Sequence, residues 1–231
     1  MMFKPAIAIV FIGMCAPAFA HLTWVEPGQN SMGLSTGHHF PAKELTVVGR
    51  YVDSITCEGQ ASNTFKLQFN ERSIRYPYTE HANNCVAVLK TTQIELTPRQ
   101  GVQHFEESKA SAELIAKARQ SSTFLEQYFK VAQMKPVELT GPLYNPDMAQ
   151  FVSKADKPDA IYLYRNGKPL AGVSVGLEYP EAPVTLWSST QADGEVKLLL
   201  RPNGKALLRA LVVEDVGQQF ESQFVSVLLE P

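Results

Sequence analysis

Short β-rich segments separated by two-residue turn signals fill the last third of the chain, and this pattern restricts the fold more than any other feature. Asn166-Gly167, Asp193-Gly194 and Asn203-Gly204 are each typical of tight turns between antiparallel strands. The apolar segments around these turns cover residues 161–164, 173–177, 184–187, 196–200, 206–213 and 220–229. Strands of this length and spacing predict a small β-sandwich from residue 159 to residue 231.

The preceding segment, residues 21–158, is also predicted to be mainly β, but with one helical insertion. Strand-like segments cover residues 22–25, 45–52, 65–69 and 86–96. Between about residues 108 and 132 the apolar residues follow a helical spacing, and Pro136 ends that region. Residues 141–158 contain Pro and Asp and are typical of a connector. The sequence therefore predicts a mainly β protein with two β-sandwich-like domains, the first with an inserted helix.

The first 20 residues have the features of a cleaved secretory signal. Lys4 precedes a short apolar run at residues 6–12, and Ala18-Phe19-Ala20 supplies the small residues that a signal peptidase requires. A lipoprotein anchor at Cys15 is the alternative. The apolar run is too short to span a bilayer. We therefore expect cleavage after Ala20 and a periplasmic or secreted protein that does not itself span a membrane.

Two cysteines follow the predicted signal, Cys57 and Cys85. An even pair in an exported chain predicts a disulfide, because disulfides persist in oxidising compartments. The alternative is a pair of soft metal ligands.

Charge and motif content exclude several classes of function. The chain has 21 Lys and Arg against 23 Asp and Glu, a formal net charge of −2, and no basic cluster, so nucleic acid is not an expected partner. It has no HExxH or CxxC pattern, no Gly-x-Ser-x-Gly elbow, no phosphate-binding Gly loop and no Rossmann fingerprint. We therefore expect no catalytic residues and a protein that is not an enzyme.

His21 would become the first residue of the mature protein. An N-terminal histidine has two nitrogen donors, the free α-amine and the imidazole Nδ1, which can chelate one metal ion. The α-amine has an ordinary pKa of about 8, so its deprotonation at neutral pH costs little. Nickel, cobalt and copper accept nitrogen donors of this kind.

All five histidines lie before residue 105, which makes the N-terminal segment the candidate metal site. They are His21, His38, His39, His81 and His104. If residues 35–41 were extended, the imidazoles of His38 and His39 would point to opposite faces, so that only one of them would join His21. His81 or His104 would complete the coordination shell. For each histidine taken alone, the alternative is an ordinary exposed loop residue.

Four short motifs resemble an exported domain-of-unknown-function family that is often found beside nickel and cobalt uptake systems. Residues 21–27 read His-Leu-Thr-Trp-Val-Glu-Pro, and residues 37–41 read Gly-His-His-Phe-Pro. Residues 165–175 contain Gly-Lys-Pro-Leu-Ala-Gly, and residues 190–195 resemble the family's Thr-Asp-Ala-Asp-Gly turn, with Gln at position 191. The resemblance implies a periplasmic metal-binding component and a C-terminal sandwich of the immunoglobulin or transthyretin type.

Three functions therefore remain open. The first is a metal-binding protein that holds Ni, Co or Cu and delivers it to a membrane transporter component. The second is a copper-dependent oxidase in which His21 and a second histidine form a copper brace. The third is a metal-free module that binds carbohydrate or protein, for which Trp24 and Trp187 could line a groove, although core packing explains both.

Overall fold

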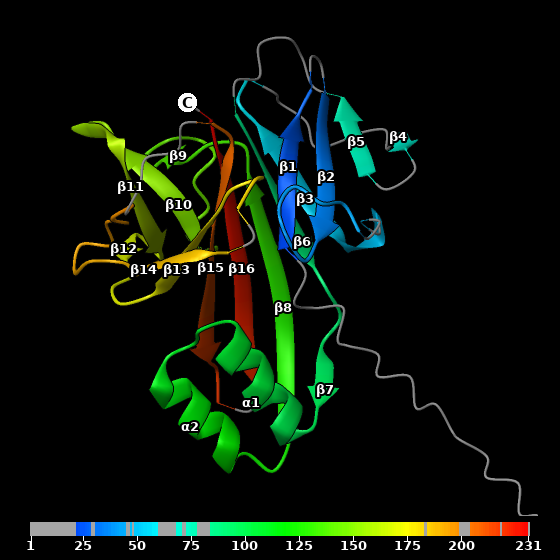
Figure 1. Ribbon diagram of the computed structural model, residues 1–231, viewed down its shortest axis with the longest axis vertical. Coiled ribbons are helices and arrows are strands. Elements are labelled where there is room, and N and C mark those ends of the chain that lie inside the picture. Colours follow the sequence, from blue (N-terminus) through cyan, green and yellow to red (C-terminus); the bar gives the residue numbers. More distant parts are fainter. Residues whose placement is uncertain are drawn as a thin grey trace, which may run out of the picture.

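An eight-stranded sheet forms the centre of the described part of the chain (Figure 1). The computed structural model describes residues 22–28, 31–44, 47, 49–59, 68–70, 73–77, 84–182, 184–198, 204–217 and 219–230. The central strands follow the order β14 (Leu186–Ser189), β13 (Ser174–Glu178), β15 (Ala206–Asp215), β16 (Phe220–Leu229), β8 (Phe124–Gln133), β6 (Cys85–Lys90) and β3 (Val52–Cys57), and β7 (Ile94–Leu96) pairs with β8. The prediction of a mainly β protein with a helical insertion is confirmed.

Two smaller sheets pack against the central one. The N-terminal sheet has the order β1 (Leu22–Pro27), β2 (Ser31–Gly37), β5 (Ser73–Pro77) and β4 (Gln68–Asn70). The other has the order β12 (Lys168–Pro169), β11 (Lys157–Arg165), β10 (Gln150–Lys154) and β9 (Val137–Glu138). In Figure 1 they lie on either side of the upper part of β15 and β16.

Alternate residues of the central strands belong to different cores. On β15, Leu208 packs in the core that includes Phe151 of β10, whereas its neighbour Leu207 packs with Leu22 and Trp24 of β1. Because successive side chains of a strand point to opposite faces, the two smaller sheets cover opposite faces of the central sheet. A strand buried on both faces has a nearly continuous apolar sequence, as residues 206–213 do.

The helical insertion consists of two helices, and its extent differs from the prediction. Helix α1 (Pro98–Glu107) begins at a capping box in which Thr97 Oγ1 accepts from the backbone N–H of Gln100. Helix α2 (Ala112–Gln120) follows. The predicted helix over residues 108–132 is therefore wrong beyond α2, because residues 124–133 form strand β8.

The burial pattern of β8 explains why its sequence resembles a helix. On β8 the buried positions alternate through Phe124, Glu126, Tyr128 and Lys130. Two of these four are charged, so the alternation of a strand is hidden in the sequence, and the remaining apolar residues imitate a helical stripe.

Three other segments also differ from the predicted elements. The 45–52 segment includes a 3₁₀ turn at Gly49–Tyr51, and its strand begins at Val52. The connector proposed for residues 141–158 contains β10 and the start of β11. In the described part of the 196–200 segment, residues 196–198, no strand is formed, and Val196 makes an isolated bridge with Thr190.

Strands from both sides of residue 158 share the central sheet. The parallel pair β8–β16 joins the N-terminal to the C-terminal segment, with Glu126 beside Phe220 and Gln133 beside Val227. The division of the chain into two domains at residue 158 remains a prediction.

The predicted disulfide is confirmed. Cys57 of β3 and Cys85 of β6 are directly opposite each other in the antiparallel pair and are bonded. A disulfide in a β-rich protein is consistent with a location outside the cytoplasm. Among the described residues, no helix is long and apolar enough to cross a bilayer.

Candidate functional site

The His38–His39 pair lies in a tight turn at the end of β2. The strand ends at Gly37, and the backbone N–H of Ala42 then donates to the carbonyl oxygen of His39 at 2.9 Å. A Cβ atom on Gly37 would lie 2.0 Å from the carbonyl oxygen of Ala42, so only glycine fits where the chain turns back. Because the chain bends here instead of continuing as a strand, both histidines are exposed near the same place.

The next residue, Phe40, anchors this turn to the core. Its ring is buried and meets Trp24 edge to face, with 5.7 Å between the ring centroids. Its backbone N–H donates to the carboxylate of Glu178 on β13 at 3.1 Å. The two histidines therefore project from a turn whose base is held in place.

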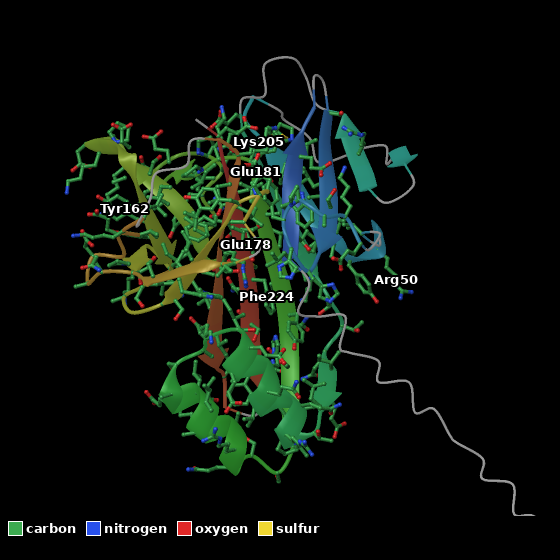
Figure 2. All side chains as sticks on the ribbon, in the orientation of Figure 1. Arg50, Tyr162, Glu178, Glu181, Lys205 and Phe224 are labelled. Atoms are coloured by element: carbon green, nitrogen blue, oxygen red, sulfur yellow. A yellow bond between two sulfur atoms is a disulfide. The ribbon has the colours of Figure 1, made fainter. Side chains whose placement is uncertain are left out.

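A cleft of about 300 Å³ opens beside this turn, between the N-terminal sheet and the helical insertion. We call it the N-terminal cleft. On β16, Phe220 packs with the helices and Leu228 packs with β1. These two residues are an even number of positions apart and point to the same face, so the helices and the N-terminal sheet cover the same face of the central sheet and leave a gap between them. The residues that line the N-terminal cleft include Leu22, Thr23, His38, His39, Glu107, Ser108, Trp187, Arg209, Leu211, Phe224 and Ser226. Figure 2 labels Phe224 at the level between the N-terminal sheet and the helices.

A carboxylate orients His38. The Glu44 side chain contacts His38 Nδ1 through Oε2, six residues further along the chain. Both side chains are partly exposed, at 54% for His38 and 39% for Glu44, so the contact contributes little to stability. Its structural effect is to hold Nδ1 towards Glu44, which is the arrangement in which carboxylates orient metal-binding histidines.

Arg209 supplies a cation to the wall of the N-terminal cleft. Its Nε lies 2.7 Å from Glu178 Oε1, and its guanidinium carbon lies 4.8 Å from the centroid of the Trp187 ring. Burial lowers the pKa of Arg209, and the Glu178 carboxylate offsets part of that effect. An arginine keeps its charge in such a setting, so the wall remains cationic.

A buried polar cluster lies behind the floor of the cleft, formed by His104, Glu126, Tyr128 and Ser222. His104 Nδ1 is 3.2 Å from the Tyr128 hydroxyl and 3.4 Å from Glu126 Oε2, and the Ser222 hydroxyl donates to Glu126 Oε1. The His104 ring also packs on Phe224, with 5.6 Å between the centroids.

This cluster is shielded from water. Glu126 and Ser222 have no exposed area, and His104 is 4% exposed. Burial raises the pKa of Tyr128 far above its ordinary value, and the charge of Glu126 raises it further. The cluster therefore holds its groups in fixed positions and is not placed to exchange a ligand with solvent.

Lys130 is a second buried charge on the same strand. Its side chain is 9% exposed, and burial lowers its pKa from 10.5 to about 8. It occupies the position on β8 directly beside Phe224 of β16.

The structure brings together two of the five histidines proposed as metal ligands. His38 and His39 both line the N-terminal cleft, whereas His104 lies inside helix α1 and is buried. His21 and His81 lie outside the described residues. Among the residues that are described, no three His, Cys, Asp or Glu side chains come together in a way that could hold a metal ion.

Sequence reasoning missed the cation in this site. Arg209 interrupts an otherwise apolar strand, residues 206–213, and an isolated charge in such a segment signals a buried partner. Its partner Glu178 similarly ends the apolar segment 173–177. Trp24 packs in the core as expected, but Trp187 lines the cleft.

Comparison with known proteins does not assign this chain to a family. The chain matches no protein-family model and no curated protein. The residues of the N-terminal cleft are therefore the basis for assigning a function to this chain.

Proposed function

We propose that this protein binds a divalent transition metal ion, Ni(II), Co(II) or Cu(II), at its mature N-terminus and delivers it to a membrane uptake system. One observation carries the proposal: Leu22 and Thr23 line the same cleft as His38 and His39. His21 is joined to Leu22 by a peptide bond, so cleavage after Ala20 would begin the mature chain next to two imidazoles. The protein acts in the periplasm or outside the cell.

His21 provides two of the donors. Its α-amine and its Nδ1 close a six-membered chelate ring on one ion, because the three atoms Cα, Cβ and Cγ lie between the two donors. Metal binding releases the amine proton, which at neutral pH is weakly held. Nitrogen donors of this type favour copper and nickel over magnesium or calcium.

His38 provides the third donor. Glu44 engages its Nδ1, and a carboxylate on one ring nitrogen directs the other towards a metal and makes it more basic. We therefore assign Nε2 of His38 as the ligand atom and Glu44 as its positioning residue. The exposure of His38 suits an ion that must be passed on, because a partner can reach it.

Substitution at the turn tests this assignment. In a titration of the mature protein with Ni(II), we expect His38→Gln to weaken binding by tenfold or more and Glu44→Gln to weaken it by about tenfold, the usual effect of losing a carboxylate behind a ligand. His39→Gln is the matched control, since it removes the neighbouring exposed imidazole, and we expect it to change the affinity by less than twofold.

The outcomes separate the two histidines. A loss of affinity in His39→Gln alone would overturn the assignment of His38. Unchanged affinity in all three variants would show that the turn takes no part in binding. All three side chains are exposed, so the thermal midpoint of unfolding is expected to stay within a few degrees of that of the native protein.

A further inference from the structure

The N-terminal cleft is much larger than a metal ion needs. Its volume of about 300 Å³ corresponds to on the order of ten water molecules, whereas an ion and one coordinated water fill a small part of it. The space extends from the histidine turn across β15 and β16 towards the end of helix α1, where Glu107 and Ser108 lie. A molecule can therefore occupy the cleft next to an ion held at its rim.

The walls of the cleft combine the cation of Arg209 with apolar surface, and the carboxylate of Glu107 lies at the far end, where α1 ends. Arg209 and Trp187 lie side by side, and Leu211 and Phe224 come from the adjacent strands β15 and β16. A guanidinium is the side chain that best matches the two oxygens of a carboxylate. These walls suit a small organic molecule with at least one carboxylate.

The nearby carboxylate of Glu178 does not cancel the preference of Arg209 for a carboxylate ligand. Its carboxylate also accepts from the backbone N–H of Phe40 at 3.1 Å and from the hydroxyl of Thr185 at 3.2 Å, so its charge is shared among three donors. It faces the Nε edge of Arg209, and a guanidinium has donors on more than one edge. Because Glu178 is buried at 4% exposure while Arg209 lines the cleft, a ligand meets the cation first.

The metal site itself needs another ligand. The proposed site supplies three protein nitrogens, which leaves at least one position open on a square-planar or tetragonal ion. His39 and Glu107 also line the cleft, and neither is assigned to the ion. A carboxylate-bearing chelator in the cleft would fill the open position and would also offset the charge of the ion.

We propose that the N-terminal cleft binds the metal as a complex with a small organic carboxylate, whose free carboxylate is held by Arg209 against Trp187. This inference depends on the proposed metal site, and it identifies the cargo as a metal chelate instead of a bare ion. No covalent step is involved, since the ion exchanges ligands and the chelator is carried with it.

Equilibrium dialysis of the mature full-length protein tests the inference. The probes are radiolabelled citrate and L-histidine, each with and without Ni(II), and diethylenetriamine serves as a chelator of similar size without a carboxylate. With Ni(II) present, we expect the protein to retain one molecule of citrate or histidine for each Ni(II) ion. Without the ion, retention of the carboxylate is expected to fall at least tenfold. We expect no retention of diethylenetriamine in either case.

The test variant is Arg209→Lys, because Arg209→Gln would leave a buried carboxylate without its counter-ion, and Glu178 itself anchors the turn that carries His38. Lysine keeps a charge beside Glu178 but lacks the planar pair of donors that matches a carboxylate. We expect this variant to bind Ni(II) in chelator-free buffer as the native protein does and to retain the carboxylate severalfold less. Trp187→Leu, which leaves both charges in place, is the second variant and is expected to weaken retention severalfold.

The two proposals fail in different ways. A native protein that does not bind Ni(II) in chelator-free buffer overturns the metal site and this inference with it. If the native protein binds Ni(II) but retains neither citrate nor histidine, this inference alone is overturned. The same holds if both chelators remove Ni(II) from the protein. Unchanged retention in both variants removes Arg209 and Trp187 from the site and also overturns it.

Discussion

Replacement of Glu126 by alanine is expected to lower the free energy of unfolding by about 3–5 kcal/mol, the usual effect of removing one member of a buried pair. Glu126 has no exposed area, and its two oxygens face the Ser222 hydroxyl and His104 Nδ1. Without the carboxylate, the buried Ser222 hydroxyl loses its acceptor, the His104 ring loses a polar neighbour, and a cavity forms between β8, β16 and α1.

Urea unfolding followed by circular dichroism measures this loss. Glu126→Gln keeps the volume and one oxygen acceptor, so we expect a smaller loss than for alanine. Glu95→Ala on the adjacent strand β7 is the matched control, since Glu95 is exposed, and it is expected to change the stability by less than about 0.5 kcal/mol. If Glu126→Ala cost no more than Glu95→Ala, the cluster would contribute nothing to the fold.

The free energy of unfolding is expected to rise as the pH increases from about 8 to 10, because of the titration of Lys130. Burial lowers its pKa from 10.5 to about 8 in the folded chain. Between these two values the unfolded chain binds more protons than the folded chain, so the free energy of unfolding rises with pH. The shift corresponds to about 3.5 kcal/mol at most, because one pKa unit is worth about 1.4 kcal/mol.

A comparison with Lys130→Met isolates this effect from other titrations. Methionine has a similar volume and no charge, so the variant is expected to be more stable than the native protein at pH 7 and to lose the dependence between pH 8 and 10. Lys90→Met on the neighbouring strand, where the lysine is exposed, is expected to keep the rise in stability between pH 8 and 10. A native protein whose stability does not rise across this window would show that the Lys130 amine is solvated.

The strands and turns of the C-terminal segment could be predicted because their signals are local. Phe220–Leu229 forms a strand with the expected bounds. At the predicted Asn166-Gly167 turn, both residues have positive φ, 53° and 68°, which Asn and Gly adopt at low cost. These preferences depend on neighbouring residues only.

Strand β8 could not be predicted because its identity depends on distant partners. Glu126 is stabilised by Ser222, 96 residues away, and by His104 in a helix. A charged residue in a buried strand position has no local signal that distinguishes it from the exposed face of a helix. Tertiary contacts decide the structure here against the local pattern.

The candidate site was also only partly predictable. The sequence predicted that one of His38 and His39 would join His21, whereas in the structure both line a cleft that is built from β1, β14, β15, β16 and the end of α1. The packing of helices and N-terminal sheet on one face of the central sheet creates that space, and no local motif encodes it.

Metal titration of the mature protein tests the central claim most directly. The N-terminus at His21 would be verified by mass spectrometry, and the protein would be titrated beside a form with one extra alanine before His21. The N-terminal site predicts that the native form binds one equivalent of Ni(II), Co(II) or Cu(II) with sub-micromolar affinity, and that the extended form does not. Equal affinity of the two forms would contradict it.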